Sequence, residues 1–261
     1  MFMPRVKNED FFEDYKCLDA KSIDLFLADP PYNLFENTEE RTGVRDPEIN
    51  IEKLDEALDH LVTANGTVLL FCNLDLLYKF IQGLDHFEFR WEYIAYKSNG
   101  MPCGPTRPLH NLEYVAVFKR KSAKATEMDF YPYESGIVKD PYCKKNNDLN
   151  HSTRKMEKRE YDINETGKRY VKQSIKMAAK CNLPEKERTQ HPFQKPVDIL
   201  RTLIRVHSSP QAMVCDGFSG VGSTLVAAQM ENRRAIGFEI DNKWVEVARN
   251  RIGKQNVKIE V

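Results

Sequence analysis

The hydrophobic pattern of the first half of the chain alternates between strand-like and helix-like segments. Residues 22–29 (SIDLFLAD) form a compact apolar run of strand length, and residues 66–72 (GTVLLFC) form a continuous one, typical of a strand covered on both faces. Between them, residues 51–64 carry Ile, Leu and Val at helical spacing, which predicts an amphipathic helix. Two further strands are predicted at 89–97 and 112–120.

The same alternation returns near the C-terminus. Residues 196–207 are predicted to be helical, followed by a strand at 212–216 (AMVCD), a short helix at 223–231 and a strand at 235–239 (AIGFE). A last helix is expected to begin near Asn242. This order predicts an α/β protein with a doubly wound, mostly parallel sheet.

The middle of the chain, residues 119–190, has a different composition. It contains 18 Lys and Arg against 11 Asp and Glu, with few apolar residues and no clear periodicity before about Tyr170. One interpretation is a solvated or partly disordered insertion. The other is a basic surface for phosphate groups, with tyrosines available for contacts to bases or sugars. The candidate phosphate-binding residues are Lys144, Lys145, Arg154 and Lys155.

Composition limits the class of protein. The 261 residues carry no net charge and are 41% hydrophobic, which suits one large domain, or a domain with an insertion, and excludes wholesale disorder. We expect a cytoplasmic protein, because no apolar run is long enough to span a membrane and the N-terminus does not resemble a secretory signal. The six cysteines lack paired C-x-x-C spacing, so no metal site is expected.

A glycine turn lies between the predicted strand at 212–216 and the next helix. Residues 214–224 read VCDGFSGVGST, in which Gly220 and Gly222 allow a tight turn that leaves backbone amides facing a ligand. Glu239 ends the following strand, where a carboxylate is able to accept hydrogen bonds from both hydroxyls of a ribose. The combination favours an adenosine-type cofactor. Leu225 occupies the place of the third glycine of a dinucleotide fingerprint, which counts against NAD.

A second polar motif, Asp29-Pro30-Pro31-Tyr32, directly follows the strand predicted at 22–29. The prolines fix the backbone, so the motif offers a carboxylate, a rigid carbonyl and an aromatic face within four residues. These groups suit a planar ring with an exocyclic amine. The alternative is a capping turn with a packed tyrosine, and the residues alone leave both open.

Three motifs in this order resemble a known family: DPPYN (29–33), HPFQKP (191–196) and DGFSGVGST (216–224). They resemble the β class of DNA amino-methyltransferases, which methylate exocyclic amines of bases. VKNEDFF (6–12) is similar to the opening strand of that family, and HNLEYVAVF (110–118) to its core strand before the variable region. The resemblance implies a Rossmann-like fold that uses S-adenosylmethionine, with an inserted basic recognition region.

The resemblance also implies a division of the chain and of its site. Residues 1–118 would form the catalytic part of the domain, 119–190 the target-recognition insertion and 191–261 the cofactor-binding part. The residues implied to hold the target base are Asp29, Pro30, Pro31 and Tyr32. The residues implied to bind the cofactor are Asp10, Gln194, Lys195, Phe218, Gly220, Gly222, Ser223, Thr224 and Glu239, with Gln194, Lys195, Ser223 and Thr224 near its methionine end.

The chain departs from the family pattern at a few positions. Gly217 replaces the usual proline after the loop aspartate, Ser223 replaces the first of two threonines, and Phe193 stands where threonine is common. Residues 33–50 are expected to form a mobile flap over the target base, with Arg41 and Arg45 either on phosphate or solvated.

The DPPY form points to adenine N6 more often than to cytosine N4 in this family, and N4-cytosine methylation is the alternative. A catalytically inactive nucleic-acid-binding homologue, and methylation of RNA or protein, are further alternatives. The resemblance implies flipping of the base from double-stranded DNA. A homodimer and a cognate restriction endonuclease are compatible with the family, and the recognition sequence is not readable from the chain.

Overall fold

Residues 3–33, 38–44, 46–101, 105–106, 108–139 and 166–256 are described by the structure, a computed structural model. Within them, eight strands form one sheet: β1 (Arg5–Lys7), β2 (Ile23–Ala28), β3 (Val62–Cys72), β4 (Phe87–Met101), β5 (His110–Arg120), β6 (Ser174–Lys176), β7 (Met213–Asp216) and β8 (Arg234–Phe238). The α-helices of the same residues are α1 (Phe11–Asp14), α2 (Thr38–Thr42), α3 (Ile51–Leu61), α4 (Leu74–Gly83), α5 (Val197–His207), α6 (Ser223–Met230) and α7 (Asn242–Asn256).

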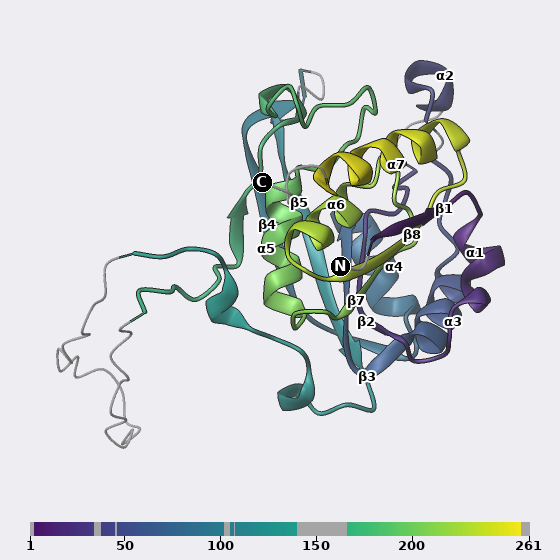
Figure 1. The fold of residues 1–261 in the computed structure, drawn as a ribbon, viewed down its shortest axis with the longest axis vertical. Coiled ribbons are helices and arrows are strands. Elements are labelled where there is room, and N and C mark those ends of the chain that lie inside the picture. The colour runs from purple at the N-terminus through teal and green to yellow at the C-terminus, as the bar shows by residue number, and fades with distance from the viewer. Residues whose placement is uncertain are drawn as a thin grey trace.

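The strand order is β1-β8-β7-β2-β3-β5-β4-β6. The pairs β1–β8, β8–β7, β7–β2, β2–β3 and β4–β6 are parallel, whereas β5 is antiparallel to both β3 and β4. This arrangement confirms the prediction of an α/β protein with a doubly wound, mostly parallel sheet (Figure 1).

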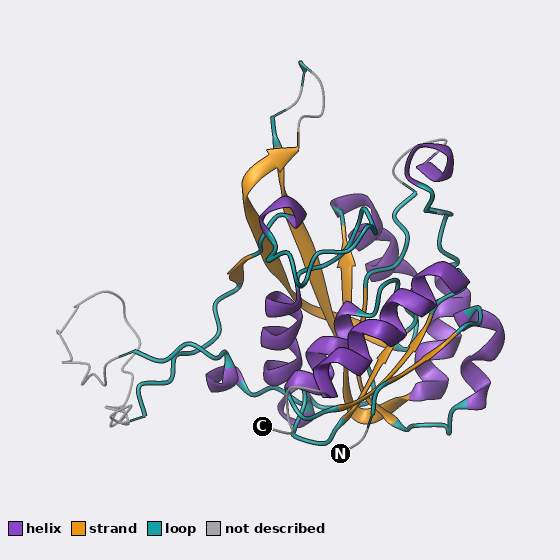
Figure 2. Ribbon diagram, turned by 45° about the horizontal axis from the view of Figure 1, so that its top comes forward, coloured by secondary structure: helices purple, strands orange, loops and turns teal. Residues whose placement is uncertain are grey.

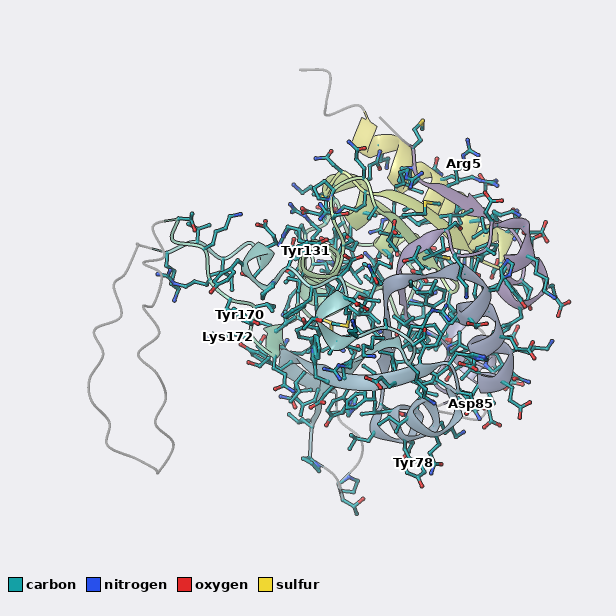
Figure 3. All side chains as sticks on the ribbon, turned by 90° about the horizontal axis from the view of Figure 1, so that it is seen from below. Arg5, Tyr78, Asp85, Tyr131, Tyr170 and Lys172 are labelled. Carbon is teal, nitrogen blue, oxygen red and sulfur yellow. The ribbon has the colours of Figure 1, made fainter. Side chains whose placement is uncertain are left out.

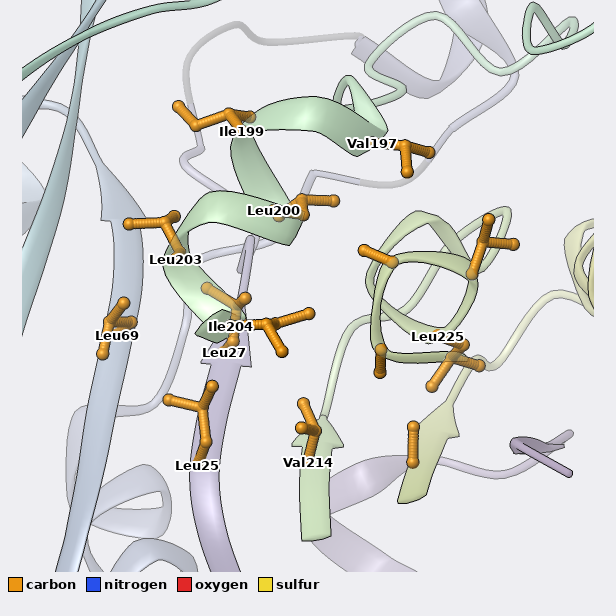
Figure 4. Packing of buried hydrophobic residues seen from close by; sticks show 14 of the residues in the cluster. Leu25, Leu27, Leu69, Val197, Ile199, Leu200, Leu203, Ile204, Val214 and Leu225 are labelled. Atoms are coloured by element: carbon orange, nitrogen blue, oxygen red, sulfur yellow. The ribbon is translucent and has the colours of Figure 1, made fainter. Parts of the chain in front are cut away.

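Helices cover both faces of the sheet (Figure 2). On one face α5, α6 and α7 pack against apolar residues of β2, β3, β5 and β7, and Figure 4 shows Leu203 and Ile204 of α5 beside Leu25, Leu27 and Leu69. On the other face α1, α3 and α4 cover the alternate residues of the same central strands. Because both faces are buried, the central strands read as continuous apolar runs rather than alternating ones.

Two of the differences from the prediction concern helices. The helix predicted to reach residue 64 ends at Leu61, because Val62 is extended and pairs with Ile23 as the first residue of β3. Helix α4 was not predicted, although Asn73 caps its first turn by accepting the Leu76 N–H. Leu74, Tyr78 and Ile81 of this helix are exposed, so its apolar residues do not lie on one face only.

The described parts of the 119–190 segment pack against the body of the protein. The N–H of Tyr131 donates to the carbonyl of Val206 on α5, and β6 extends the sheet beside β4. Tyr131 and Tyr170 lie on the same side of the molecule in Figure 3, where the segment leaves the body. A fully solvated insertion therefore does not describe these parts. Lys144, Lys145, Arg154 and Lys155 lie outside the described residues.

No helix within the described ranges has both the length and the apolar character needed to cross a bilayer.

Candidate active site

The predicted site residues gather at the carboxyl ends of the parallel strands. Asp29 follows β2, Asp216 ends β7, and Glu239 follows β8. Strands β2 and β7 are neighbours, yet the chain proceeds from β2 toward one edge of the sheet and from β7 toward the other. A doubly wound sheet forms its ligand crevice at such a switch point, outside the carboxyl ends of the strands. The fold therefore brings together two motifs that are far apart in sequence.

Asp29 is the centre of a polar group at the end of β2. Its Oδ1 accepts the hydroxyl of Tyr32 at 2.8 Å, and its Oδ2 accepts the ammonium of Lys195 at 2.6 Å. Lys195 lies two residues before α5, next to the N-cap Pro196, so the start of the helix helps to fix its position. Lys195 thus contacts Asp29, and a contact with the methionine end of the cofactor stays a prediction.

Glu113 and Lys97 complete this group, and sequence reasoning missed both. Glu113 Oε2 lies 3.2 Å from Lys195 Nζ, and Lys97 donates to Glu113 Oε1. Glu113 lies on β5, one residue before Tyr114, which pairs with Cys72 at the carboxyl end of β3. The charged residue just before the apolar run YVAVF was the available signal. Charges therefore alternate along Lys97, Glu113, Lys195 and Asp29.

The protonation of this group follows from burial and from its charges. Burial raises the pKa of Asp29, Glu113 adds to the rise, and Lys195 opposes it. Burial would raise the pKa of Glu113 as well, but Lys195 and Lys97 outweigh it and lower that pKa to about 2. Burial lowers the pKa of Lys195, and the two carboxylates outweigh it, so the net shift is upward. Glu113 and Lys195 are therefore both charged at neutral pH.

Asp46 connects the predicted flap to the Asp29 motif. Its Oδ1 accepts the backbone N–H groups of Tyr32, at 2.6 Å, and Asn33, at 2.9 Å. Asn33 has a φ of 51°, a left-handed conformation that asparagine adopts more readily than most residues. Pro30 is buried and Pro31 is half-buried, which fixes the chain before this turn. Arg45 and the side chain of Arg41 lie outside the described residues.

The glycine turn is held by two carboxylates. Asp216 accepts the N–H of Phe218 at 3.0 Å, and Glu239 Oε2 accepts the N–H of Gly220 at 2.9 Å. Glu239 Oε1 accepts the N–H of Asp241 at 2.8 Å. Burial raises the pKa of Asp216 to about 7; hydrogen bonds from Thr224 and Phe218 oppose this, while the charges of Asp29 and Glu239 add to it. These three carboxylates lie within electrostatic reach of one another.

Glycines allow close packing around this turn. Gly222 has a φ of 71°, and a Cβ built on it would lie 2.9 Å from Ala248 Cβ on α7. At Gly217, where the family usually has proline, a Cβ would lie 2.9 Å from the ring of Phe11. The phenylalanine ring therefore occupies the space of a side chain at 217, which accounts for this departure.

Strand β1 ends beside the carboxyl end of β8, on the same side of the sheet as the rest of the site. The N–H of Glu239 donates to the carbonyl of Lys7 on β1, so Asp10, three residues further on, lies on the Glu239 side of the site. Asp10 is exposed and accepts the N–H of Phe12 as the N-cap of α1. The rings of Phe12 and Phe218 are 5.8 Å apart. Asp10, Phe218 and Glu239 are thus brought together.

The remaining predicted cofactor residues have structural contacts. Gln194 is buried and holds its own loop by accepting the N–H and hydroxyl of Thr189. Ser223 Oγ lies 3.1 Å from a guanidinium nitrogen of Arg251, which donates to the carbonyl of Val221 as well. His191, from the HPFQKP motif, lies against Gly220 and contacts the Trp244 ring edge-on.

Comparison with known proteins identifies the family. Residues 23–250 match the model of the DNA methylase family of N6 and N4 methyltransferases. The chain belongs to this family, which confirms the resemblance inferred from its motifs.

Two curated relatives come from Haemophilus influenzae. The type II methyltransferase M.HinfI is 25% identical over 283 residues, which cover 96% of this chain and 68% of M.HinfI. The type II methyltransferase M.HindIII is 35% identical over 74 residues, which cover 28% of this chain and 24% of M.HindIII. The match to M.HindIII thus spans about a quarter of that enzyme.

Two solved structures share the fold. The M1.HpyAVI–SAM complex has a TM-score of 0.64 at 21% identity and covers 96% of this chain and 99% of that one. PvuII DNA methyltransferase (cytosine-N4-specific) has a TM-score of 0.67 at 13% identity and covers 95% of this chain and 86% of that one. Both likenesses confirm the Rossmann-like fold.

Family membership gives S-adenosylmethionine as the cofactor, and the site fits it. An ionised carboxylate has about four lone-pair positions, and Glu239 uses two of them for the backbone of Gly220 and Asp241. Two remain for the hydroxyls of a ribose. The glycine turn beside Glu239 presents little side-chain bulk, and Phe12 and Phe218 supply aromatic surface next to it.

Proposed function

We propose that this protein transfers a methyl group from S-adenosylmethionine to the exocyclic N6 of adenine in double-stranded DNA. The observation that carries the proposal is the placement of Asp29 across the switch point between β2 and β7, close enough for its charge to act on Asp216, which holds the glycine turn. The DPPY form of the motif supports adenine over cytosine. We further propose that the base is flipped out of the duplex, because the amine of a stacked base is not accessible to a largely buried carboxylate such as Asp29.

The roles of the residues follow from their contacts. Asp29 is held by Tyr32 and Lys195, so its carboxylate has a fixed orientation toward the incoming amine. Accepting an N–H from the amine localises the nitrogen lone pair for attack. Burial makes Asp29 a better acceptor by raising its pKa. Glu239 and the glycine turn would hold the cofactor, which supplies an electrophilic methyl group when bound. Positioning provides most of the acceleration in such a direct transfer.

The partners are part of the same proposal. The basic residues Lys144, Lys145, Arg154 and Lys155 are proposed to contact DNA phosphates. The curated relatives are type II methyltransferases, which supports a partnership with a restriction endonuclease and, with it, a cytoplasmic location. The presence of Asp29, Tyr32, Lys195 and Glu239 favours an active enzyme over an inactive homologue, because buried carboxylates paired with a cation are frequent at catalytic sites.

The test is transfer of labelled methyl from S-adenosylmethionine to mixed-sequence duplex DNA, followed by nucleoside mass analysis. N6-methyladenine that disappears in Asp29→Ala would support the proposal. If the product is N4-methylcytosine, the target base is cytosine and not adenine. Glu231→Gln is a matched control, because Glu231 is a largely buried, ion-paired carboxylate outside the crevice. Cofactor binding without methylated DNA would contradict the proposal, and RNA would then be the next substrate to test.

A further inference from the structure

The ion pairs around Lys195 are unequal. Its Nζ lies 2.6 Å from Asp29 Oδ2 in a hydrogen bond and 3.2 Å from Glu113 Oε2 as an ion pair. Glu113 Oε2 is buried, and among the described residues its contact is this longer ion pair with Lys195, whose geometry is poorer than that of a regular hydrogen bond. A buried carboxylate oxygen without a hydrogen bond is costly, so such an oxygen needs an explanation.

The environment of Lys195 allows its ammonium to move between the two carboxylates. The side chains of Lys195 and Glu113 are each 13% exposed, and the Lys195 ammonium lies 5.0 Å from the centre of the Phe71 ring and 5.6 Å from that of Tyr32. Lys97 holds the other oxygen of Glu113, so Glu113 has a fixed position. A small movement of the Lys195 ammonium would satisfy Glu113 Oε2 and release Asp29 Oδ2.

We propose that Glu113 is a positioning residue that receives the Lys195 ammonium when the target amine binds to Asp29. This inference rests on the proposed function, since the amine is the donor that displaces Lys195. In the free protein Lys195 neutralises Asp29 and keeps it oriented. When the amine N–H arrives, Lys195 moves to Glu113, and Asp29 becomes a stronger acceptor. No proton is transferred in this exchange, because both Lys195 and Glu113 remain charged.

The proposal makes opposite predictions for substitutions of Glu113 and of Lys97. In Glu113→Gln, the ammonium has only one carboxylate and stays on Asp29, and the Glu113 charge that helps to raise the pKa of Asp29 is lost, so the pKa of Asp29 falls. In Lys97→Met, Glu113 has no other cation and draws Lys195 away, so the pKa of Asp29 rises. The other titratable groups near Asp29 are Tyr32, Cys72 and Asp216. The charge of Glu113 contributes to the raised pKa of Tyr32, so Glu113→Gln lowers that pKa as well, whereas Glu113 is not among the causes of the raised pKa of Cys72 or Asp216.

The direct test is a ¹³C NMR titration of aspartate carboxylates in the free protein, with Asp29 assigned from Asp29→Asn. This measurement requires no methyl transfer, so it separates a failure of the inference from a failure of the proposed function. We expect the Asp29 midpoint to move to lower pH in Glu113→Gln and to higher pH in Lys97→Met. Equal midpoints in the wild type and both variants, or shifts in the same direction, would overturn the proposal.

Kinetics provide the second readout, using mixed-sequence duplex DNA and labelled S-adenosylmethionine. In Glu113→Gln we expect kcat to fall at least about tenfold with little change in KM for the cofactor, and the acid limb of kcat/KM to move to lower pH. Glu113→Asp, which keeps the charge, should recover part of kcat. Glu231 is 11% exposed and pairs with two arginines. Glu231→Gln removes this carboxylate and should leave the acid limb of kcat/KM at its wild-type pH. A wild-type kcat and pH profile in Glu113→Gln would contradict a positioning role.

Discussion

The substitution Gly222→Ala tests how tightly the glycine turn is packed. At a φ of 71°, an L-residue in the left-handed region costs about 1–2 kcal/mol. The added Cβ would lie 2.9 Å from Ala248 Cβ, and overpacking of this kind costs about 1–3 kcal/mol. The two effects together predict a loss of about 2–5 kcal/mol in the free energy of unfolding.

Gly220→Ala is the matched control in the same turn. Its φ is 49°, but the nearest described atom to an added Cβ is His191 Nε2 at an ordinary 3.6 Å, so only the conformational cost applies. Urea denaturation followed by circular dichroism measures both variants. Ala248→Gly in the Gly222→Ala background should recover part of the loss by removing the opposing methyl group. The reasoning is refuted if Gly222→Ala is no more destabilising than Gly220→Ala, or if Ala248→Gly gives no recovery.

Three further predictions concern the cofactor, the nucleic acid and pH. Glu239→Gln should weaken S-adenosylmethionine binding about 10- to 100-fold in calorimetry, since a hydrogen bond to a charged group is worth about 1.5–3 kcal/mol; unchanged binding would exclude Glu239 as the ribose ligand. Neutralising Lys144, Lys145, Arg154 and Lys155 should flatten the salt dependence of DNA binding, by about 0.9 in logarithmic slope for every phosphate that is no longer neutralised, and an unchanged slope would place the DNA surface elsewhere. Burial raises the pKa of Asp216 to about 7 in the folded protein, against 3.8 as its ordinary value, so the folded state binds the extra proton and stability falls as pH rises between about 4 and 7. Asp216→Asn should reduce that fall, which is measured as the urea midpoint at several pH values. A variant whose urea midpoint changes with pH as much as that of the wild type would contradict the prediction.

The sequence predicted the central sheet well, because its strands are buried on both faces and carry long apolar runs. It failed where a pattern was mixed: α4 exposes Leu74, Tyr78 and Ile81, so its apolar residues do not define one face. It placed the boundary of α3 three residues late, because Val62 suits both a helical face and a strand, and pairing with Ile23 decided between them.

The candidate site was predicted only as far as local motifs reach. Asp29, Tyr32 and Glu239 stand in short motifs with recognisable chemistry. Glu113 and Lys97 were missed because their relation to Lys195 depends on the pairing of β5 with β3 and β4. Asp46 was missed for a similar reason, since its backbone contacts arise from the return of the flap to Tyr32. A charged residue beside an apolar run marks a candidate, but one sequence does not show which distant residue it contacts.

The order of the strands has a consequence for biosynthesis. In the described sheet, β1 pairs with β8 alone, so β1 acquires its partner only after residues 234–238 have been made. Until then the nascent chain contains Asp29 but not Glu239. The edge of β2 that pairs with β7 stays unpaired until β7 has been made. Such long-range pairing slows folding and leaves strand edges exposed meanwhile. During translation the methyl-transfer site is therefore not assembled until β7 and β8 have been made, because Asp216 and Glu239 stand at the ends of these strands.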